Sequence, residues 1–126
     1  MSSSSPSTPS YPLGRFLRGF SFAGQGIWHA VRTQRNMRVH LAAAVAAIIA
    51  GIVLRISAAD WACVALAIGL VIAAEIFNTA VEALADLHAG GIHPLAKTAK
   101  DAAAGAVLVA SIAAVGVGIA VFVPRL

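Results

Sequence analysis

The chain has 126 residues, of which 60% are hydrophobic and only 11% are charged, and its formal net charge is +4. This composition lies outside the range of soluble globular proteins and indicates an integral membrane protein of one domain. The basic residues lie at the ends of apolar runs and are not interleaved with aromatic residues, so no nucleic-acid partner is expected. The single cysteine, Cys63, excludes an internal disulfide and a thiolate metal site.

The N-terminal region divides into a tail and an amphipathic segment. Serine and proline dominate the start of the chain, which cannot bury enough surface to offset the entropy of ordering, so we expect a disordered tail over 1–13. From about 14 to 34, apolar residues recur every three or four positions opposite a basic face, which predicts a helix lying in the membrane interface. Gln34 falls on the apolar side of this helix, so we expect it to face protein or membrane.

Three apolar segments follow, and we expect each to cross the membrane as a helix, over about 38–56, 60–86 and 95–123. The first segment contains a short uncharged run, which arginine side chains at both ends can extend by reaching the interface. The second continues beyond its uncharged run through a row of acidic residues. The sequence therefore predicts an all-α membrane protein, with residues 14–126 as its membrane domain.

The positive charges predict the orientation of these helices. Five arginines precede the first apolar run and two lysines lie between the apolar runs of the second and third spans, whereas the opposite side has only Arg55 and Arg125. The positive-inside rule then places the N-terminus and the 87–100 loop in the cytoplasm. The first apolar run begins only at Leu41, so we expect no cleaved secretory signal and expect the spans to remain in the mature protein.

The second span carries the most informative pattern, a polar stripe formed by Glu75, Asn78, Glu82 and Asp86. On a helix these four residues lie on one side, within about 80° of arc. Ionisable residues at membrane depth are unfavourable and therefore indicate a functional site. Glu75 lies about 16 Å before the cytoplasmic end of the helix at Asp86, a depth at which it can meet the polar end of a lipid.

The segment after this span supplies complementary groups. Pro94 is expected near a helix start, and Lys97, Lys100 and Asp101 then share one face. Carboxylates that can hold Mg²⁺ beside lysines that can hold phosphates are the groups that phosphoryl transfer requires. No Walker A or Gly-x-Gly-x-x-Gly loop is present, so ATP would be bound by another design. The sequence contains neither a Gly-x-Ser-x-Gly nor a His-Glu-x-x-His motif, so it gives no support for hydrolytic chemistry.

Two blocks of sequence are diagnostic together, Glu-x-x-Asn-Thr-Ala-x-Glu at 75–82 and Ala-Lys-Asp at 99–101. With the segment 33–40 before the first span, they resemble the prokaryotic diacylglycerol kinase family, which includes undecaprenol kinases, over about residues 14–123. The resemblance implies a small homotrimeric enzyme of the prokaryotic cell membrane, with active sites shared between subunits. It would use ATP and Mg²⁺ to phosphorylate the hydroxyl of undecaprenol or diacylglycerol, and segments 33–40 and 93–97 resemble the undecaprenol kinases more closely.

The resemblance also assigns roles to residues. Glu75 matches the general base that takes the proton from the lipid hydroxyl, and Asn78 matches its polar neighbour at the substrate. The residues matched to nucleotide contacts are Arg15, Glu82, His93, Lys100 and Asp101. Arg15 is also expected near the lipid substrate, and Glu82 is expected to bind the metal.

Gln34 departs from the family pattern, because many members carry a second metal-binding glutamate at this position. Its amide oxygen can still ligate Mg²⁺, so Gln34 remains a candidate metal ligand in a site with one negative charge fewer. Weaker metal affinity, a metal held chiefly by Glu82 and phosphates, and altered substrate choice all remain open.

A second class of function also remains open. A small oligomeric proton or cation conductor would use the intramembrane carboxylates as its ion path. That function explains Glu75 but leaves Lys100, Asp101 and the amphipathic helix without a role. His40, which precedes the first apolar run, is expected to be interfacial or exposed.

Overall fold

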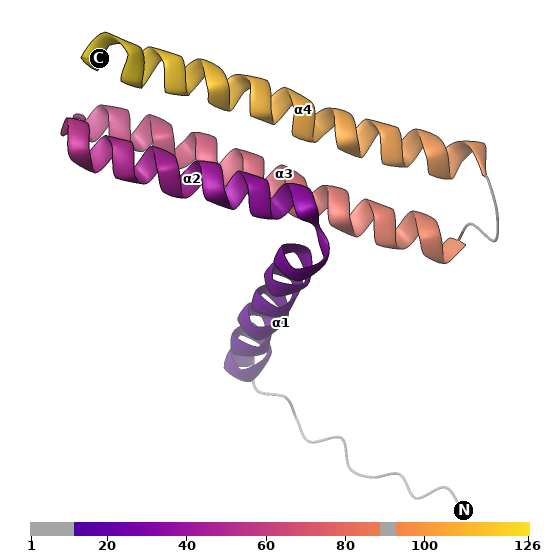
Figure 1. Cartoon of the computed structure of the whole chain (residues 1–126). Helices are drawn as coiled ribbons and strands as arrows, with labels where there is room; N and C mark the ends of the chain where they lie inside the picture. The colour runs from indigo at the N-terminus through magenta and orange to yellow at the C-terminus, as the bar shows by residue number, and fades with distance from the viewer. Residues whose placement is uncertain (1–11, 89–92) are drawn as a thin grey trace, which may run out of the picture.

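The computed structural model describes residues 12–88 and 93–126, and over these ranges the regular structure is entirely helical. Its elements are α1 (Pro12–Thr33), α2 (Arg35–Leu54), α3 (Ala58–His88), α4 (Pro94–Phe122) and a 3₁₀ turn, η1 (Val123–Arg125). Helices α2, α3 and α4 run side by side, and α1 leaves them at a steep angle (Figure 1). The predicted all-helical architecture is therefore confirmed. Most of the predicted tail over 1–13 lies outside the described residues, and α1 already begins at Pro12.

Three helices are long and apolar enough to cross a membrane, over Arg35–Leu54, Ala58–Leu87 and Pro94–Arg125. Few apolar side chains are buried within the chain, and many large ones are exposed along these helices, such as Ile52, Leu66 and Leu108. Lipid tails accommodate such side chains as readily as a protein interior does. The fold is that of a multi-pass membrane protein, as the composition predicted.

The chain changes direction between α1 and α2 at one residue, Gln34. Its backbone is extended (φ −106°, ψ 113°), which ends α1 at Thr33 and lets α2 start at Arg35 without a loop. The Gln34 amide still donates to the Ala30 carbonyl at 2.9 Å. Ala30 and Met37, on the two sides of this turn, are fully buried and fix the end of α1 against the bundle.

The turn between α2 and α3 is defined by Arg55, which has the positive φ of 52° that ends many helices. The amides of Arg55 and Ile56 donate to carbonyls of the last turn of α2, at 3.4 and 3.2 Å. The Ser57 hydroxyl accepts a bond from the Asp60 amide at 3.1 Å and so caps the start of α3. This turn brings the two helices together in an antiparallel arrangement.

The bundle is fastened at the end that contains this turn. Ile56, Val64 and Val121 form a buried cluster joining the α2–α3 turn, α3 and α4. The Arg125 guanidinium also binds the Asp60 carboxylate, with an Nη2–Oδ2 distance of 2.6 Å. Because these contacts fix the register of α3 against α4, they determine which residues meet at the opposite end, where the polar stripe lies.

Candidate active site

The polar stripe lies in the second half of α3 and faces the protein rather than lipid. Glu75 is 1% exposed and Asn78 is 7% exposed. Glu82 is half-buried, and Asp86, near the end of the helix, is exposed. The stripe therefore runs from a buried carboxylate to an open one along a single 31-residue helix.

The middle of the stripe forms a cluster with the turn between α1 and α2. Two side-chain amides donate to the two carboxylate oxygens of Glu82: Nε2 of Gln34 at 3.4 Å and Nδ2 of Asn78 at 3.4 Å. We call Gln34, Asn78 and Glu82 the Glu82 cluster. Gln34 faces protein, as the apolar side of its segment predicted, because the extended backbone at this residue directs it toward α3.

The chemistry of the Glu82 cluster fits Mg²⁺ shared with a nucleotide. Within residues 12–88 and 93–126, no three His, Cys, Asp or Glu side chains lie close enough to hold a metal ion. The cluster instead combines one carboxylate with two amides, and the buried Oδ1 atom of Asn78 has no hydrogen-bond partner. Oxygen donors suit Mg²⁺, which is commonly bound by one or two carboxylates together with substrate phosphates.

Glu75 lies deeper along α3, and neither of its carboxylate oxygens makes a hydrogen bond. The neighbouring Thr79 hydroxyl donates to the backbone oxygen of Glu75 at 3.0 Å instead. From α2, the Nε2 atom of His40 lies 3.8 Å from Oε2 of Glu75. An orphan buried carboxylate is unusual in proteins and requires an explanation.

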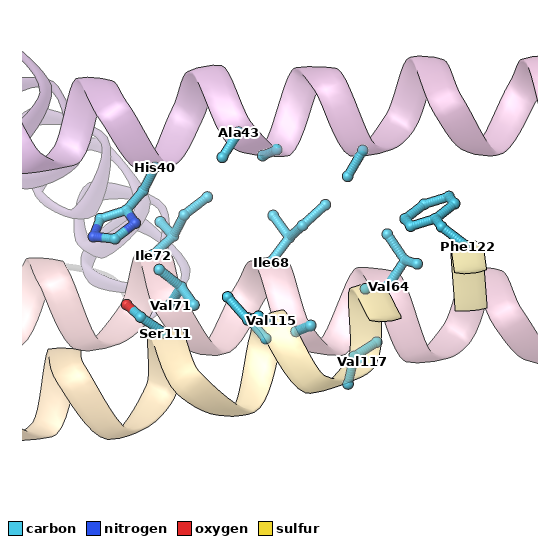
Figure 2. Close-up of a pocket in the computed structure, with 15 residues that line it drawn as sticks. His40, Ala43, Val64, Ile68, Val71, Ile72, Ser111, Val115, Val117 and Phe122 are labelled. Carbon is cyan, nitrogen blue, oxygen red and sulfur yellow. The ribbon is translucent and has the colours of Figure 1, made fainter. Parts of the chain in front are cut away.

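His40 is the neighbour of Glu75 that the sequence reasoning missed. We expected it to be interfacial or exposed; its side chain is 21% exposed and points from α2 into the bundle (Figure 2), so it is not fully exposed. No local pattern marks this residue, because the face of α2 that meets α3 is decided by tertiary packing. From Leu41 onward α2 is uniformly apolar, so this part of the helix gives no amphipathic signal to identify that face.

A cavity of about 320 Å³ lies between α2, α3 and α4, beginning beside His40 (Figure 2). Apolar side chains line most of it, from small ones such as Ala43 to larger ones such as Ile68, and Ser111 adds a hydroxyl from α4. The cavity therefore combines apolar walls with a polar end close to Glu75.

The outer end of the stripe meets the lysines of α4. Nζ of Lys100 lies 2.5 Å from Oδ1 of Asp86, and Nζ of Lys97 lies 2.6 Å from Oδ2 of Asp101 within α4. Both pairs are largely exposed and therefore contribute little to stability. A phosphate could displace either carboxylate from its lysine at small cost.

Two further predicted site residues, His93 and Arg15, lie at the starts of α4 and α1. His93 caps α4, where its Nδ1 atom accepts a bond from the Leu95 amide at 3.1 Å and Pro94 occupies the first turn, as predicted. Arg15 lies near the start of α1, about 27 Å from Thr33 at the rise of an α-helix. That end of α1 is distant from the bundle (Figure 1). One chain therefore gathers the stripe, Gln34 and Lys100 but leaves Arg15 apart.

The three membrane-spanning helices bury a carboxylate, and at one end they carry an oxygen-donor cluster and lysines. These features define a small integral-membrane enzyme suited to phosphoryl transfer. The chain belongs to the prokaryotic diacylglycerol kinase family, whose sequence profile matches residues 21–122. The protein is therefore a lipid kinase, as predicted from the sequence, and the alternative of an ion conductor receives no support.

Two relatives are similar to this protein over most of the chain. The undecaprenol kinase of Bacillus subtilis (strain 168) is 45% identical over 114 residues, which are 90% of this chain and 93% of that protein. The diacylglycerol kinase of a Synechocystis species is 47% identical over 111 residues, which are 87% of this chain but 63% of that protein.

Proposed function

We propose that the protein transfers the γ-phosphate of ATP to the primary hydroxyl of undecaprenol at the cytoplasmic surface of a prokaryotic cell membrane. The observation that carries this proposal is the Glu75 carboxylate, which is 1% exposed within a membrane span and lacks a hydrogen bond on either oxygen. A carboxylate without hydrogen bonds at this depth is suited to accept a proton from a lipid alcohol.

In this mechanism Glu75 is the general base. It accepts the hydroxyl proton while the lipid oxygen forms a bond to the γ-phosphorus and the bond from that phosphorus to the bridging oxygen of ADP breaks. Asn78, one turn further along α3, lies between this base and Glu82, so we place it beside the reacting hydroxyl. Positioning and charge neutralisation supply most of the catalysis in such reactions.

The Glu82 cluster would hold Mg²⁺ through the Glu82 carboxylate and the amide oxygen of Gln34. Bound there, the ion would neutralise charge on the β- and γ-phosphates. Lys100 and Asp101 would contact the nucleotide, since Lys100 already reaches the outer end of the stripe through Asp86. His93 lies at the start of the same helix and would contact the nucleotide from there.

Arg15 would serve the site of a neighbouring subunit. It lies near the start of α1, at the end far from the bundle, which supports an assembly in which each site combines residues of two subunits. We take this assembly to be the homotrimer that the family resemblance implies. The many apolar side chains exposed on α2, α3 and α4 leave ample surface for such packing as well as for lipid.

Undecaprenol is preferred to diacylglycerol as the substrate because the undecaprenol kinase of B. subtilis aligns over 93% of its length. The test offers purified protein both lipids at matched surface concentration with labelled ATP and Mg²⁺. Transfer chiefly to undecaprenol supports the proposal, and transfer chiefly to diacylglycerol would make diacylglycerol the preferred substrate. Transfer to neither lipid refutes both substrates.

A further inference from the structure

The proposed mechanism leaves one neighbour of Glu75 without a role. His40 enters from α2, and its Nε2 atom lies 3.8 Å from Oε2 of Glu75. The Glu75 side chain is 1% exposed and that of His40 is 21% exposed, so the contact lies inside the bundle. The imidazole points from α2 into the space between the helices (Figure 2).

The polar side chains within one turn of Glu75 on α3 are engaged elsewhere. The Thr79 hydroxyl donates to the backbone oxygen of Glu75 at 3.0 Å, and Nδ2 of Asn78 donates to Oε1 of Glu82 at 3.4 Å. Neither therefore fixes the Glu75 carboxylate. A buried carboxylate that can rotate freely would be a poor base, because proton transfer requires a defined geometry.

The separation of His40 and Glu75 suits a contact that tightens on substrate binding. At 3.8 Å the pair is within ion-pair range but about 1 Å longer than a hydrogen bond. Catalytic hydrogen bonds are often long in a ligand-free enzyme and shorten in its complex. A small movement of α2 or of either side chain would let the imidazole donate to Oε2 and leave Oε1 to accept the substrate proton.

We propose that His40 is a positioning residue, which holds Oε2 of Glu75 so that Oε1 faces the acceptor hydroxyl. This inference rests on the proposed role of Glu75 as the base. In metal sites, removing a group that orients a ligand typically costs tenfold to a hundredfold in affinity or activity, and we expect a loss of similar size here. The loss should appear in kcat, because the proposed nucleotide contacts lie further along the stripe and on α4.

The test compares His40→Leu, which removes the donor at similar volume, with His40→Gln, which keeps an N–H donor of similar reach. His40→Leu should lower kcat by about tenfold to a hundredfold with the KM for ATP unchanged, and His40→Gln should recover most of the loss. His29→Leu is the matched control, because His29 is an exposed histidine on α1, and its kcat should equal that of the wild type. Thermal melting of each variant in detergent shows whether the fold is retained.

A double variant isolates the coupling between the two residues. If His40 acts through Glu75, adding His40→Leu to Glu75→Gln should cause no further loss, because groups that act as a unit are strongly non-additive. Independent, multiplicative losses would overturn the inference. So would full activity of His40→Leu, or equal losses in His40→Leu and His40→Gln that follow their melting temperatures.

These outcomes are distinguishable from failure of the proposed function. If Glu75→Gln is inactive while His40→Leu is fully active, Glu75 remains the base and only the positioning role fails. If Glu75→Gln is as active as the wild type, the proposed mechanism itself fails, and the role of His40 fails with it.

Discussion

The side-chain amide of Gln34 lies 3.4 Å from the carboxylate of Glu82, and this contact joins the turn between α1 and α2 to the middle of the polar stripe. The contact brings together residues 48 positions apart in sequence. Since the backbone at Gln34 is extended, its side chain reaches α3 at the point where a metal-bound nucleotide is proposed. The position of the surface helix and the chemistry of the cluster are thus physically linked.

Replacing Gln34 by glutamate should strengthen metal binding. A second carboxylate beside Glu82 adds one negative charge and another oxygen ligand, both of which favour Mg²⁺. We expect the Mg²⁺ concentration for half-maximal activity to fall by about tenfold in Gln34→Glu and to rise in Gln34→Leu. A magnesium titration of kinase activity checks this prediction, and identical titrations for all three proteins would place Gln34 outside the metal site.

Replacing Glu75 by glutamine should remove the general base with little change in shape. We expect kcat to fall by about 10²–10⁴-fold, the range for loss of a positioned base. The melting temperature should not fall, because the substitution replaces a buried carboxylate that makes no hydrogen bond by a neutral amide. The control is His29→Gln, a substitution at an exposed position of α1, which should retain activity. Labelled phosphate transfer to lipid measures both variants.

Replacing Lys100 by alanine should weaken nucleotide binding. Lys100 reaches across to α3, whereas Lys97 pairs within α4, so Lys100→Ala should raise the KM for ATP by about tenfold and Lys97→Ala by less. The KM for the lipid should change little in either variant. Steady-state kinetics with each substrate varied in turn test the prediction, and equal effects of the two lysines would contradict it.

The helices and the polar stripe could be predicted from the sequence because each depends on local order along the chain. Long apolar runs require membrane-spanning helices, and the spacing of Glu75, Asn78, Glu82 and Asp86 requires one helical face. That this face turns into the protein was also predictable, since carboxylates are unfavourable against lipid. The residue roles taken from the family resemblance remain predictions.

Contacts between helices could not be predicted in the same way. His40 meets Glu75 because of how α2 is rotated against α3, and the apolar run of α2 from Leu41 onward does not encode that rotation. The pairing of Lys100 with Asp86 depends on the register of α3 against α4. Contacts at the other end of the bundle, including the Asp60–Arg125 ion pair, fix this register. Such relationships follow from packing over the whole bundle.

Replacing Gly51 by alanine should destabilise the bundle. An added Cβ would lie 2.7 Å from the Trp61 ring and 3.0 Å from Ile56, too close for van der Waals contact. We expect a loss of about 1–3 kcal/mol, typical of overpacking. In a Trp61→Leu background the same substitution should cost much less, because the ring is absent. Thermal or denaturant melting in detergent measures this cycle, and an equal cost in both backgrounds would contradict the proposed clash.

The orientation predicted from the charges can be tested with single cysteines. In a Cys63→Ser background, a membrane-impermeant thiol reagent added to intact cells should label Ala59→Cys, near the α2–α3 turn, but not Leu95→Cys, at the start of α4. Both positions are exposed in the structure, so burial within the chain would not explain a difference. The reverse pattern of labelling would invert the topology.

The close packing of Gly51 against Trp61 and the Asp60–Arg125 ion pair hold the helices together at one end of the bundle. This arrangement affects the order in which activity and helical structure are lost on heating. Near the polar stripe an exposed ion pair, Lys100–Asp86, joins α4 to α3, and a long amide contact joins Gln34 to Glu82, so local fraying should start there. Warmed samples should therefore stop phosphorylating lipid while circular dichroism still reports intact helices. An enzyme of this design would lose its chemistry before it loses its shape.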